Sequence, residues 1–237
     1  MAAPVRTSSL RMVLLIVCAA IAWFWNQYQK DHAGENGPRS VAITREDPEE
    51  TTQPSRRRVG GETMGNYEVY RNCRLANEKH NDGDSFEVHL PDGRGEVFRL
   101  YFVDCPESDF KSYAGGDTNH KRISDQAEML GITPEQAVQI GQQAKHFTLD
   151  LLASKPFTIY TAWDSPYHDN RFHAFVEVEE NGKPRWLHEL LVERGFCRIY
   201  TKGAGLPDGT SLSDHKDLLR AKEREARSSR AGAWGLR

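Results

Sequence analysis

The chain of 237 residues predicts a mixed α+β domain that contains a small β-barrel. Three observations support this fold class: strand-like segments separated by turn sequences, one strongly capped helix near the middle, and a charged amphipathic helix near the C-terminus. The expected order is three strands, a helix, two strands and two more helices, which is typical of an α+β domain. With 38% hydrophobic and 27% charged residues, the composition is that of a globular protein with one domain of ordinary size.

The N-terminal segment carries the features of an export sequence. Residues 12–25 (MVLLIVCAAIAWFW) form an unbroken apolar run that follows Arg6 and Arg11, and this layout is typical of a secretory signal. Residues 20–22 (AIA) offer a cleavage site, whereas the aromatic residues after them suit an uncleaved anchor. We therefore expect residues 1–29 to be a signal peptide or a signal anchor, and the rest of the chain to be exported. The membrane contact would be through residues 12–25 if they are retained.

Residues 30–65 predict a flexible linker. The segment is polar, with an acidic stretch at 46–50 (EDPEE) and a basic one at 56–58 (RRR), and such composition cannot bury a core. The charge runs are interpreted as solvated linker. Because the net charge of the chain is −3, no global basic field attracts nucleic acid, and any binding of a polyanion has to be local.

The first strands are expected from about Asn66 onward. A strand-like stretch begins at Tyr67, and after a turn at residues 82–83 apolar and polar residues alternate along a half-buried strand over 85–90. By the same alternation Asp84 faces the apolar side. A hairpin turn at 91–94 (PDGR) leads into a third strand over residues 97–103.

The helices follow in the second half of the chain. Thr133 to Gln136 (TPEQ) is a capping box with proline at the first helical position, and an apolar stripe with helical spacing continues to Leu151. A weaker helical pattern covers 119–130. The remaining expected elements are strands over 157–162 and 172–178, a helix over 187–194 stopped by glycine, an extended piece over 196–200 and a helix over 213–227. Trp234 is expected to pin the C-terminal tail.

A cluster of charges at the ends of two neighbouring strands indicates a chemical site. Arg99 lies inside the apolar run 97–103, where a guanidinium is costly to bury unless a partner or ligand compensates it. Asp104 and Glu107 follow the run, and Asp84 begins the preceding strand. Arg99 and Asp104 would point to opposite faces of one ideal strand, so the chain must turn before Asp104 for both to meet one ligand. We take Pro106 as the cause of that turn.

Several separated motifs resemble the staphylococcal-nuclease-like (thermonuclease) family. They are residues 82–85 (DGDS), 98–107 (FRLYFVDCPE), 171–175 (RFHAF), 189–195 (ELLVERG) and a last helix running into Ala233-Trp234. The resemblance covers about residues 66–236, and it implies an OB-fold barrel with about three helices in a domain of residues 66–237. It also implies a monomeric endonuclease that hydrolyses phosphodiester bonds in DNA and/or RNA with Ca²⁺ as its cofactor.

The resemblance assigns a role to each of five charged residues. Asp84 and Asp104 match calcium ligands, Arg99 and Arg171 match phosphate-binding residues, and Glu107 matches the general base of the family. The chemistry suits these roles because calcium takes hard oxygen ligands, paired guanidinium donors match phosphate oxygens, and a carboxylate can accept a proton from water. Whether Glu107 accepts that proton or only positions the water stays open.

Cys105 departs from the family pattern, which usually has threonine after the second aspartate. A backbone carbonyl of Cys105 would still serve as a metal ligand, whereas its thiol would disfavour calcium. Two of the other cysteines, Cys73 and Cys197, are candidates for a disulfide in an oxidising compartment. The alternative function is a non-catalytic OB-fold module that binds nucleic acid or protein at a membrane; such modules typically lack one or more of the five charged residues, and all five are present here.

Overall fold

The computed structural model describes residues 62–76, 79–167 and 169–237 of the chain. All the described residues belong to one compact unit, Arg56–Arg237. The expected apolar helix over residues 12–25 and most of the expected linker lie outside the described residues. Among the helices of residues 62–237, none is both long and apolar enough to span a bilayer.

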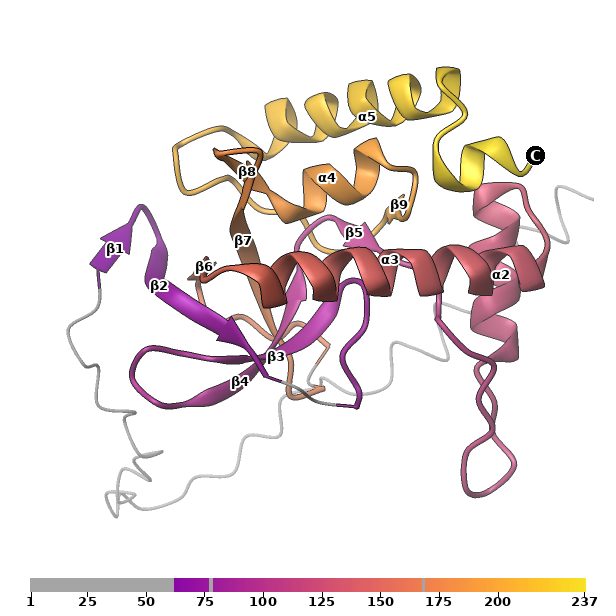
Figure 1. Cartoon of the computed structure of the whole chain (residues 1–237), viewed down its shortest axis with the longest axis horizontal. Helices are drawn as coiled ribbons and strands as arrows, with labels where there is room; N and C mark the ends of the chain where they lie inside the picture. The colour runs from indigo at the N-terminus through magenta and orange to yellow at the C-terminus, as the bar shows by residue number, and fades with distance from the viewer. Residues whose placement is uncertain (1–61, 77–78, 168) are drawn as a thin grey trace, which may run out of the picture. The chain divides into compact units, whose positions relative to one another are not determined.

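Five strands close into a β-barrel, which confirms the predicted α+β class (Figure 1). In spatial order they are β2 (Tyr67–Leu75), β3 (Ser85–His89), β4 (Gly95–Leu100), β7 (Phe172–Glu180) and β6 (Phe157–Thr161). The barrel closes because β6 pairs with β2. The pair of β4 and β7 is parallel, and the other neighbouring pairs of the barrel are antiparallel. The three expected early strands form an antiparallel meander.

Short strands extend this barrel at its edges. β1 (Glu62–Met64) folds back on β2, and β8 (Lys183–Trp186) pairs with β7. A separate two-stranded ladder joins β5 (Val103–Asp104) to β9 (Arg198–Ile199). Neither β1 nor β8 was predicted: β1 begins at Glu62, ahead of the expected start at Asn66, and its three residues are all exposed, so it has no apolar periodicity.

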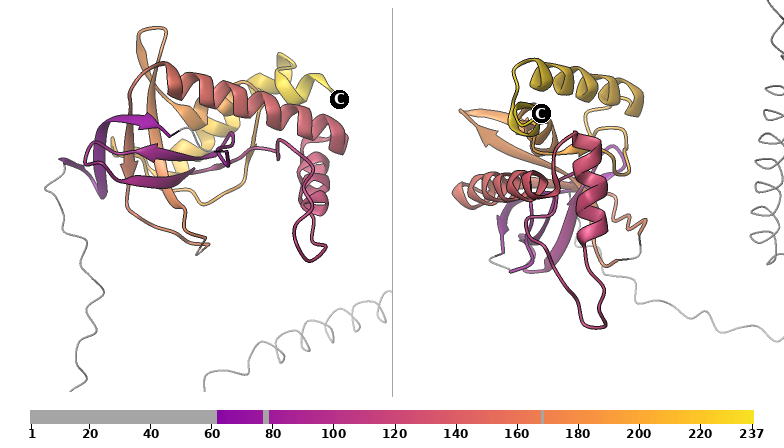
Figure 2. Two further views of the ribbon diagram at one scale, coloured as in Figure 1. Left: turned by 60° about the horizontal axis from the view of Figure 1, so that its bottom comes forward. Right: turned by 90° about the vertical axis from the view of Figure 1, so that its right-hand side faces the viewer.

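The described part of the chain has four α-helices rather than about three, because the weaker helical pattern forms a full helix. They are α2 (His120–Leu130), α3 (Pro134–Ser154), α4 (Leu187–Glu193) and α5 (Leu212–Ser228). α3 begins at the predicted capping box, in which Thr133 Oγ1 accepts from the Gln136 amide at 3.3 Å and Gln136 Oε1 accepts from the Thr133 amide at 2.9 Å. α4 and α5 lie side by side, and α2 packs crosswise against the end of α3 at which that helix begins (Figure 2).

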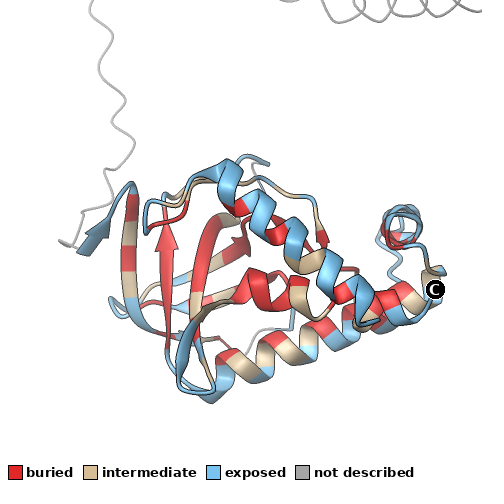
Figure 3. Cartoon of the chain, turned by 90° about the horizontal axis from the view of Figure 1, so that it is seen from above, coloured by how far each residue is buried: buried red, intermediate tan, exposed pale blue. Residues whose placement is uncertain are grey.

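The main core fills the barrel and continues under α4. Buried residues run along the barrel strands, while α5 shows a largely exposed outer face (Figure 3). Trp234 belongs to a second cluster with Leu130 of α2, Ile140 of α3 and Ala226 of α5. The predicted role of Trp234 is therefore confirmed, since its ring ties the short 3-10 helix Gly232–Gly235 to three helices.

Candidate functional site

Asp104 lies at the centre of the charged cluster and is 2% exposed. Its Oδ1 accepts hydrogen bonds from Arg99 Nη2 at 2.7 Å and from Arg122 Nη2 at 3.1 Å. Its Oδ2 accepts from Arg198 Nε at 2.8 Å and from Gln126 Nε2 at 3.0 Å. Charge-assisted hydrogen bonds are the strong ones in proteins, so this carboxylate organises side chains from β4, β9 and α2 around one point.

The expected turn before Asp104 is present, and Phe102 makes it. β4 ends at Leu100, β5 begins at Val103, and Phe102 between them has a φ of 69°. A positive φ lies outside the extended region of backbone conformations. Phe102 therefore interrupts the alternation of side chains between the two faces of the strand. Arg99 and Asp104 therefore face each other despite their odd separation. Our prediction that Pro106 causes the turn is therefore wrong. The turn is at Phe102, where packing of the aromatic ring in the core holds the backbone in this conformation.

Asp84 meets the same arginine from the neighbouring strand. It directly precedes β3 and is 5% exposed, and its Oδ2 accepts from Arg99 Nη2 at 3.4 Å and from the Cys105 amide at 2.9 Å. One guanidinium nitrogen thus lies between two carboxylates. Arg99 Nε is buried and has no hydrogen-bond partner among the described residues. Since buried donors are almost always paired, this N–H has capacity for an acceptor on a ligand.

The buried carboxylates of this region differ in how strongly nearby positive charges and hydrogen bonds stabilise their ionised forms. Burial, together with the negative charge of Asp84, raises the pKa of Asp82 to about 6. Burial and the charge of Asp104 also raise the pKa of Asp84, against the opposing effect of Arg99. For Asp104, burial is outweighed by the bond from Gln126 and by three arginines, so its pKa is lowered. Asp82 and Asp84 are therefore the carboxylates whose ionised forms a nearby cation would stabilise.

Glu107 belongs to the cluster through Arg122. Glu107 Oε1 pairs with Arg122 Nη1 at 3.2 Å, and its Oε2 accepts from Asn119 Nδ2 at 3.4 Å. The Glu107 amide donates to Gln126 Oε1 at 3.1 Å, so α2 holds both the backbone and the side chain of this residue. A Cβ on Gly141 of α3 would come within 2.4 Å of the Glu107 carbonyl oxygen, and only glycine allows this close approach.

Arg171 does not contact this cluster. It directly precedes β7, pairs with Asp169, and donates from Nη1 to Ser85 Oγ at 3.2 Å. Ser85 follows Asp84 in the chain and lies opposite Arg99 in the β3–β4 register. The structure therefore brings together four of the five charged residues and places Arg171 next to them, bound to a carboxylate of its own loop.

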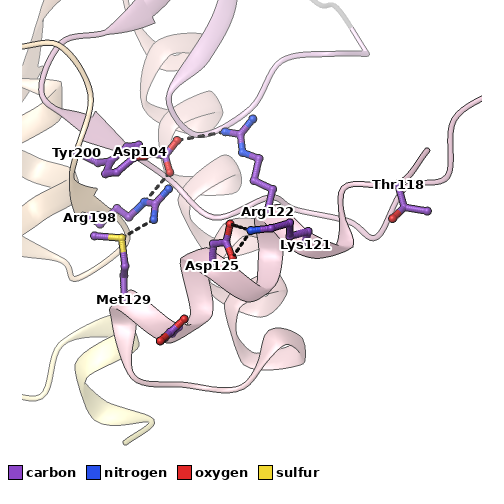
Figure 4. Close-up of a pocket in the computed structure, with 9 residues that line it drawn as sticks. Asp104, Thr118, Lys121, Arg122, Asp125, Met129, Arg198 and Tyr200 are labelled. Carbon is purple, nitrogen blue, oxygen red and sulfur yellow. Dashed lines mark hydrogen bonds and ion pairs between the residues drawn. The ribbon is translucent and has the colours of Figure 1, made fainter. Parts of the chain in front are cut away.

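Two pockets flank the cluster. The larger, of about 620 Å³, has Asp104 in its wall together with Arg122, Arg198 and Tyr200 (Figure 4). Figure 4 shows Arg122 and Arg198 reaching Asp104 from opposite sides, and Lys121 paired with Asp125 on the same helix. The other pocket, of about 390 Å³, is lined by Arg171, Asp169 and Ser85 among others.

Cys105 is buried, and its backbone carbonyl already has a hydrogen-bond partner. Its carbonyl oxygen accepts from Gln126 Nε2 at 3.0 Å, so the expected carbonyl ligand is turned toward α2. Cys73, Cys105 and Cys197 are buried free thiols. The candidate pair of Cys73 and Cys197 is not joined: the Cys73 thiol donates to the Tyr70 carbonyl at 3.1 Å, and the β5–β9 register places Cys105 opposite Cys197.

Sequence reasoning missed three members of the cluster: Arg122, Gln126 and Arg198. Arg198 stands in the short apolar stretch 196–200 as Arg99 does in its own strand, so the same criterion applied there would have found it. Arg122 and Gln126 are four residues apart on one face of α2, together with Asn119 three residues before Arg122. That pattern alone does not separate a site from an ordinary polar helix face.

The comparisons with known proteins leave the site to be interpreted from its own geometry. No family model matches the chain, and no curated protein matches it. Among the described residues, three potential metal-ligand side chains come within 4.8 Å of one another at His188, Glu189 and His215, away from the cluster of Asp104.

Proposed function

We propose that residues 66–237 form a staphylococcal-nuclease-like domain that hydrolyses phosphodiester bonds in DNA and/or RNA with the help of calcium. The observation that carries this proposal is the environment of Arg99. Its guanidinium is 5% exposed, is fixed by Asp84 and Asp104, and still has an unpaired buried Nε–H among the described residues. A phosphate oxygen is the acceptor that matches such a donor best.

The strand order supports an OB-fold. The barrel has the order β2-β3-β4-β7-β6, closes on β2 and contains one parallel pair, and this arrangement is consistent with a five-stranded barrel of the OB type. This fold binds oligonucleotides in many proteins, but fold alone does not give function. The proposal therefore rests on the side chains at the barrel end rather than on the barrel.

Two features of this cluster support a calcium ion as the cofactor. Asp84 and Asp104 offer hard carboxylate oxygens on either side of one cationic nitrogen, and the raised pKa values of Asp82 and Asp84 indicate negative charge that a cation would stabilise. Bound calcium would offset phosphate charge and orient water. Asp84 and Asp104 would hold it, and the Arg99 guanidinium would then turn to the phosphate.

Under this proposal, the arginines bind the phosphate and Glu107 acts on the attacking water. Arg99 and Arg171 would donate paired hydrogen bonds to phosphate oxygens, Arg171 by exchanging Asp169 for the substrate. Glu107 would accept a proton from the attacking water, or position that water, as the new P–O bond forms and the ester P–O bond breaks. Arg122 would orient Glu107, since it contacts both Glu107 and Asp104.

One observation favours the alternative of a non-catalytic module that binds nucleic acid or protein. Both oxygens of Asp104 are engaged by three arginines and Gln126, so calcium has to compete with positive charges already in place. In that case the same arginines would bind phosphate without hydrolysis, and affinity would fall steeply as the salt concentration rises.

Digestion of plasmid DNA and of RNA by the full chain tests the proposal. We expect cleavage with calcium, none with EDTA, and losses of about 10²-fold or more for Glu107→Gln and Arg171→Ala. Arg185→Ala is the matched control, because Arg185 of β8 pairs with Glu180 and Glu193 rather than with residues of the cluster. Salt-sensitive binding without any cleavage would replace the nuclease with the binding module, and neither binding nor cleavage would refute both.

The proposed location is outside the cytoplasm, either secreted or held at the membrane by residues 12–25. Fractionation of cells that express the full chain, with Ala22→Arg for comparison, tests this part. A wild-type protein that sediments with membranes and is released by the substitution supports the anchor. A soluble, shortened product supports cleavage, and a full-length protein in the cytoplasm contradicts export.

A further inference from the structure

Cys105 and Cys197 occupy facing positions at the end of the β5–β9 ladder. The register pairs Val103 with Ile199 and Asp104 with Arg198, so the next pair is Cys105 with Cys197. The Tyr200 amide donates to the Phe102 carbonyl at 2.7 Å, which makes that position a hydrogen-bonded one. Pairs alternate along an antiparallel ladder, so the cysteine pair falls at a non-hydrogen-bonded position.

The backbone of Cys105 agrees with this assignment. Its amide donates to Asp84 Oδ2 and its carbonyl accepts from Gln126 Nε2, so neither group is used between the two strands. At non-hydrogen-bonded positions the facing Cα atoms are about 4.5 Å apart. That separation lies within the range of about 4.4–6.8 Å found across disulfides.

Both cysteines are also buried, since Cys105 is 4% and Cys197 is 2% exposed. Burial and the neighbouring Cys197 thiol raise the pKa of the Cys105 thiol, as expected for two thiols at facing positions of the ladder. The third described cysteine, Cys73, has a backbone carbonyl as its partner instead. We propose that Cys105 and Cys197 form a disulfide when the protein folds in an oxidising compartment, and that this bond fastens β9 to β5 beside the Asp104–Arg198 ion pair.

The oxidation is a thiol–disulfide exchange with a low-molecular-weight disulfide such as oxidised glutathione. One cysteine thiolate attacks that disulfide, forms a mixed disulfide and releases one thiol. The second cysteine then attacks the protein sulfur of the mixed disulfide and releases the second small thiol, so two protein thiols are oxidised as one small disulfide is reduced. Because both cysteines are buried in the folded chain, the exchange takes place during folding, before the strands close over them.

Peptide mapping tests the bond directly. The full chain is unfolded, refolded in a mixture of reduced and oxidised glutathione, alkylated and digested with trypsin without reduction. We expect residues 100–111 linked to residues 195–198, with the Cys73 peptide alkylated. Cys73→Ser should leave the link unchanged, and Cys197→Ser should remove it. Alkylation of both Cys105 and Cys197, or a link from either to Cys73 or Cys18, would overturn the proposal.

Thermal unfolding gives a second readout that does not depend on peptide recovery. The bond would close a loop that contains α2, α3, β6, β7 and α4, and cross-links over long loops stabilise by restricting the unfolded chain. We expect the midpoint of the refolded, oxidised protein to exceed that of the reduced protein by about 4–16 °C. Cys105→Ala, checked for its fold by circular dichroism, should show no such difference. Equal midpoints of oxidised and reduced wild type would contradict the bond.

Neither readout requires catalysis. An active enzyme without the linked peptides refutes the disulfide alone, and linked peptides in an inactive protein refute the nuclease alone.

Discussion

At the residue scale, Asp104 decides how the site is built. Its side chain is 3% exposed and receives hydrogen bonds from three arginines and one glutamine. A buried ion pair is weak evidence for net stability, but the removal of one partner leaves the other charges uncompensated, which is strongly destabilising. Asp104 is therefore both a candidate ligand and the group that allows Arg99 and Arg198 to be buried.

We expect Asp104→Asn to lower the free energy of unfolding by about 3–5 kcal/mol, because the buried Arg198 loses its carboxylate partner and the buried Arg99 keeps only the longer contact with Asp84. Urea denaturation monitored by tryptophan fluorescence measures the change. Arg122→Ala is the comparison: the Arg122 side chain is 44% exposed, and loss of its pairs should cost no more than about 1 kcal/mol. Similar costs for the two variants would contradict the central role of Asp104.

Arg99 shows which part of the site can be predicted from a single residue in the sequence and which part cannot. A charge inside an apolar strand is visible in the sequence, and the structure compensates it with Asp84 and Asp104. The contact with Asp104 depends on the φ of 69° at Phe102, and no local pattern predicts that a phenylalanine adopts this conformation. Tertiary packing of the Phe102 ring among Phe175, His188 and His215 selects it.

At the scale of elements, α3 was predicted from its capping box, and its start at Pro134 follows from local chemistry alone. α2 is different, since its N-cap residue Asn119 makes no side-chain cap bond and its first turn has no acidic residue. Contacts with α3 and with the segment 104–107 stabilise α2 instead. Helices whose stability comes from packing are the ones that sequence patterns predict least well.

α4 and α5 enclose a pair of buried histidines. His188 Nε2 and His215 Nε2 are 2.7 Å apart, and both side chains are 0% exposed. Burial lowers the pKa of His215 to about 4, with Lys222 acting in the same direction and Asp208 against it. Burial, His215 and Lys222 lower the pKa of His188 as well. The folded protein therefore holds both rings neutral at pH values where an unfolded histidine is protonated.

We expect the free energy of unfolding to fall as the pH drops from about 6.5 toward about 4. Below pH 6.5 the unfolded chain binds protons that the folded pair excludes, and each such histidine contributes up to about 1.4 kcal/mol per pH unit. The raised pKa of Asp82 acts in the opposite direction over part of this range.

Urea denaturation at pH 7 and pH 5 measures the effect of this pair. His215→Gln keeps a hydrogen-bond partner for His188 and removes one titrating ring, so its loss of stability between the two pH values should be smaller. His89→Gln, at an exposed position, should behave like wild type. An equal loss in the wild type and in His215→Gln would show that the pair does not control acid stability.

At the scale of the whole molecule, β2, β3 and β4 were predicted in order, and the barrel class follows from them. The strand pairs that close the barrel could not be predicted from local patterns. β2 pairs with β6 across more than 80 residues of sequence, and β4 pairs in parallel with β7. The same closure brings Arg171, at the start of β7, next to Ser85. Long-range pairing therefore assembles the candidate site, and only its individual members are visible in the sequence.

Calcium should stabilise the whole domain if Asp84 and Asp104 hold it. A ligand that binds only the folded state adds about 2.7 kcal/mol at 100 times its dissociation constant, which for a domain of this size raises the thermal midpoint by about 5–11 °C. The increase should be larger at pH 7 than at pH 5, because Asp82, with a pKa of about 6, is largely protonated at pH 5 and adds less negative charge to the site.

Thermal unfolding with calcium, with magnesium and with EDTA at both pH values tests this linkage. Asp84→Asn should remove the shift, because it removes a carboxylate oxygen next to the proposed ion. Asp125→Asn is the matched control, since Asp125 lines the neighbouring pocket, is 54% exposed and pairs with Lys121, and it should keep the shift. A shift of equal size in Asp84→Asn would place calcium elsewhere on the protein. No shift in the wild type would show that calcium does not displace the arginines that bind Asp104. The domain would then bind phosphate through these arginines without a metal.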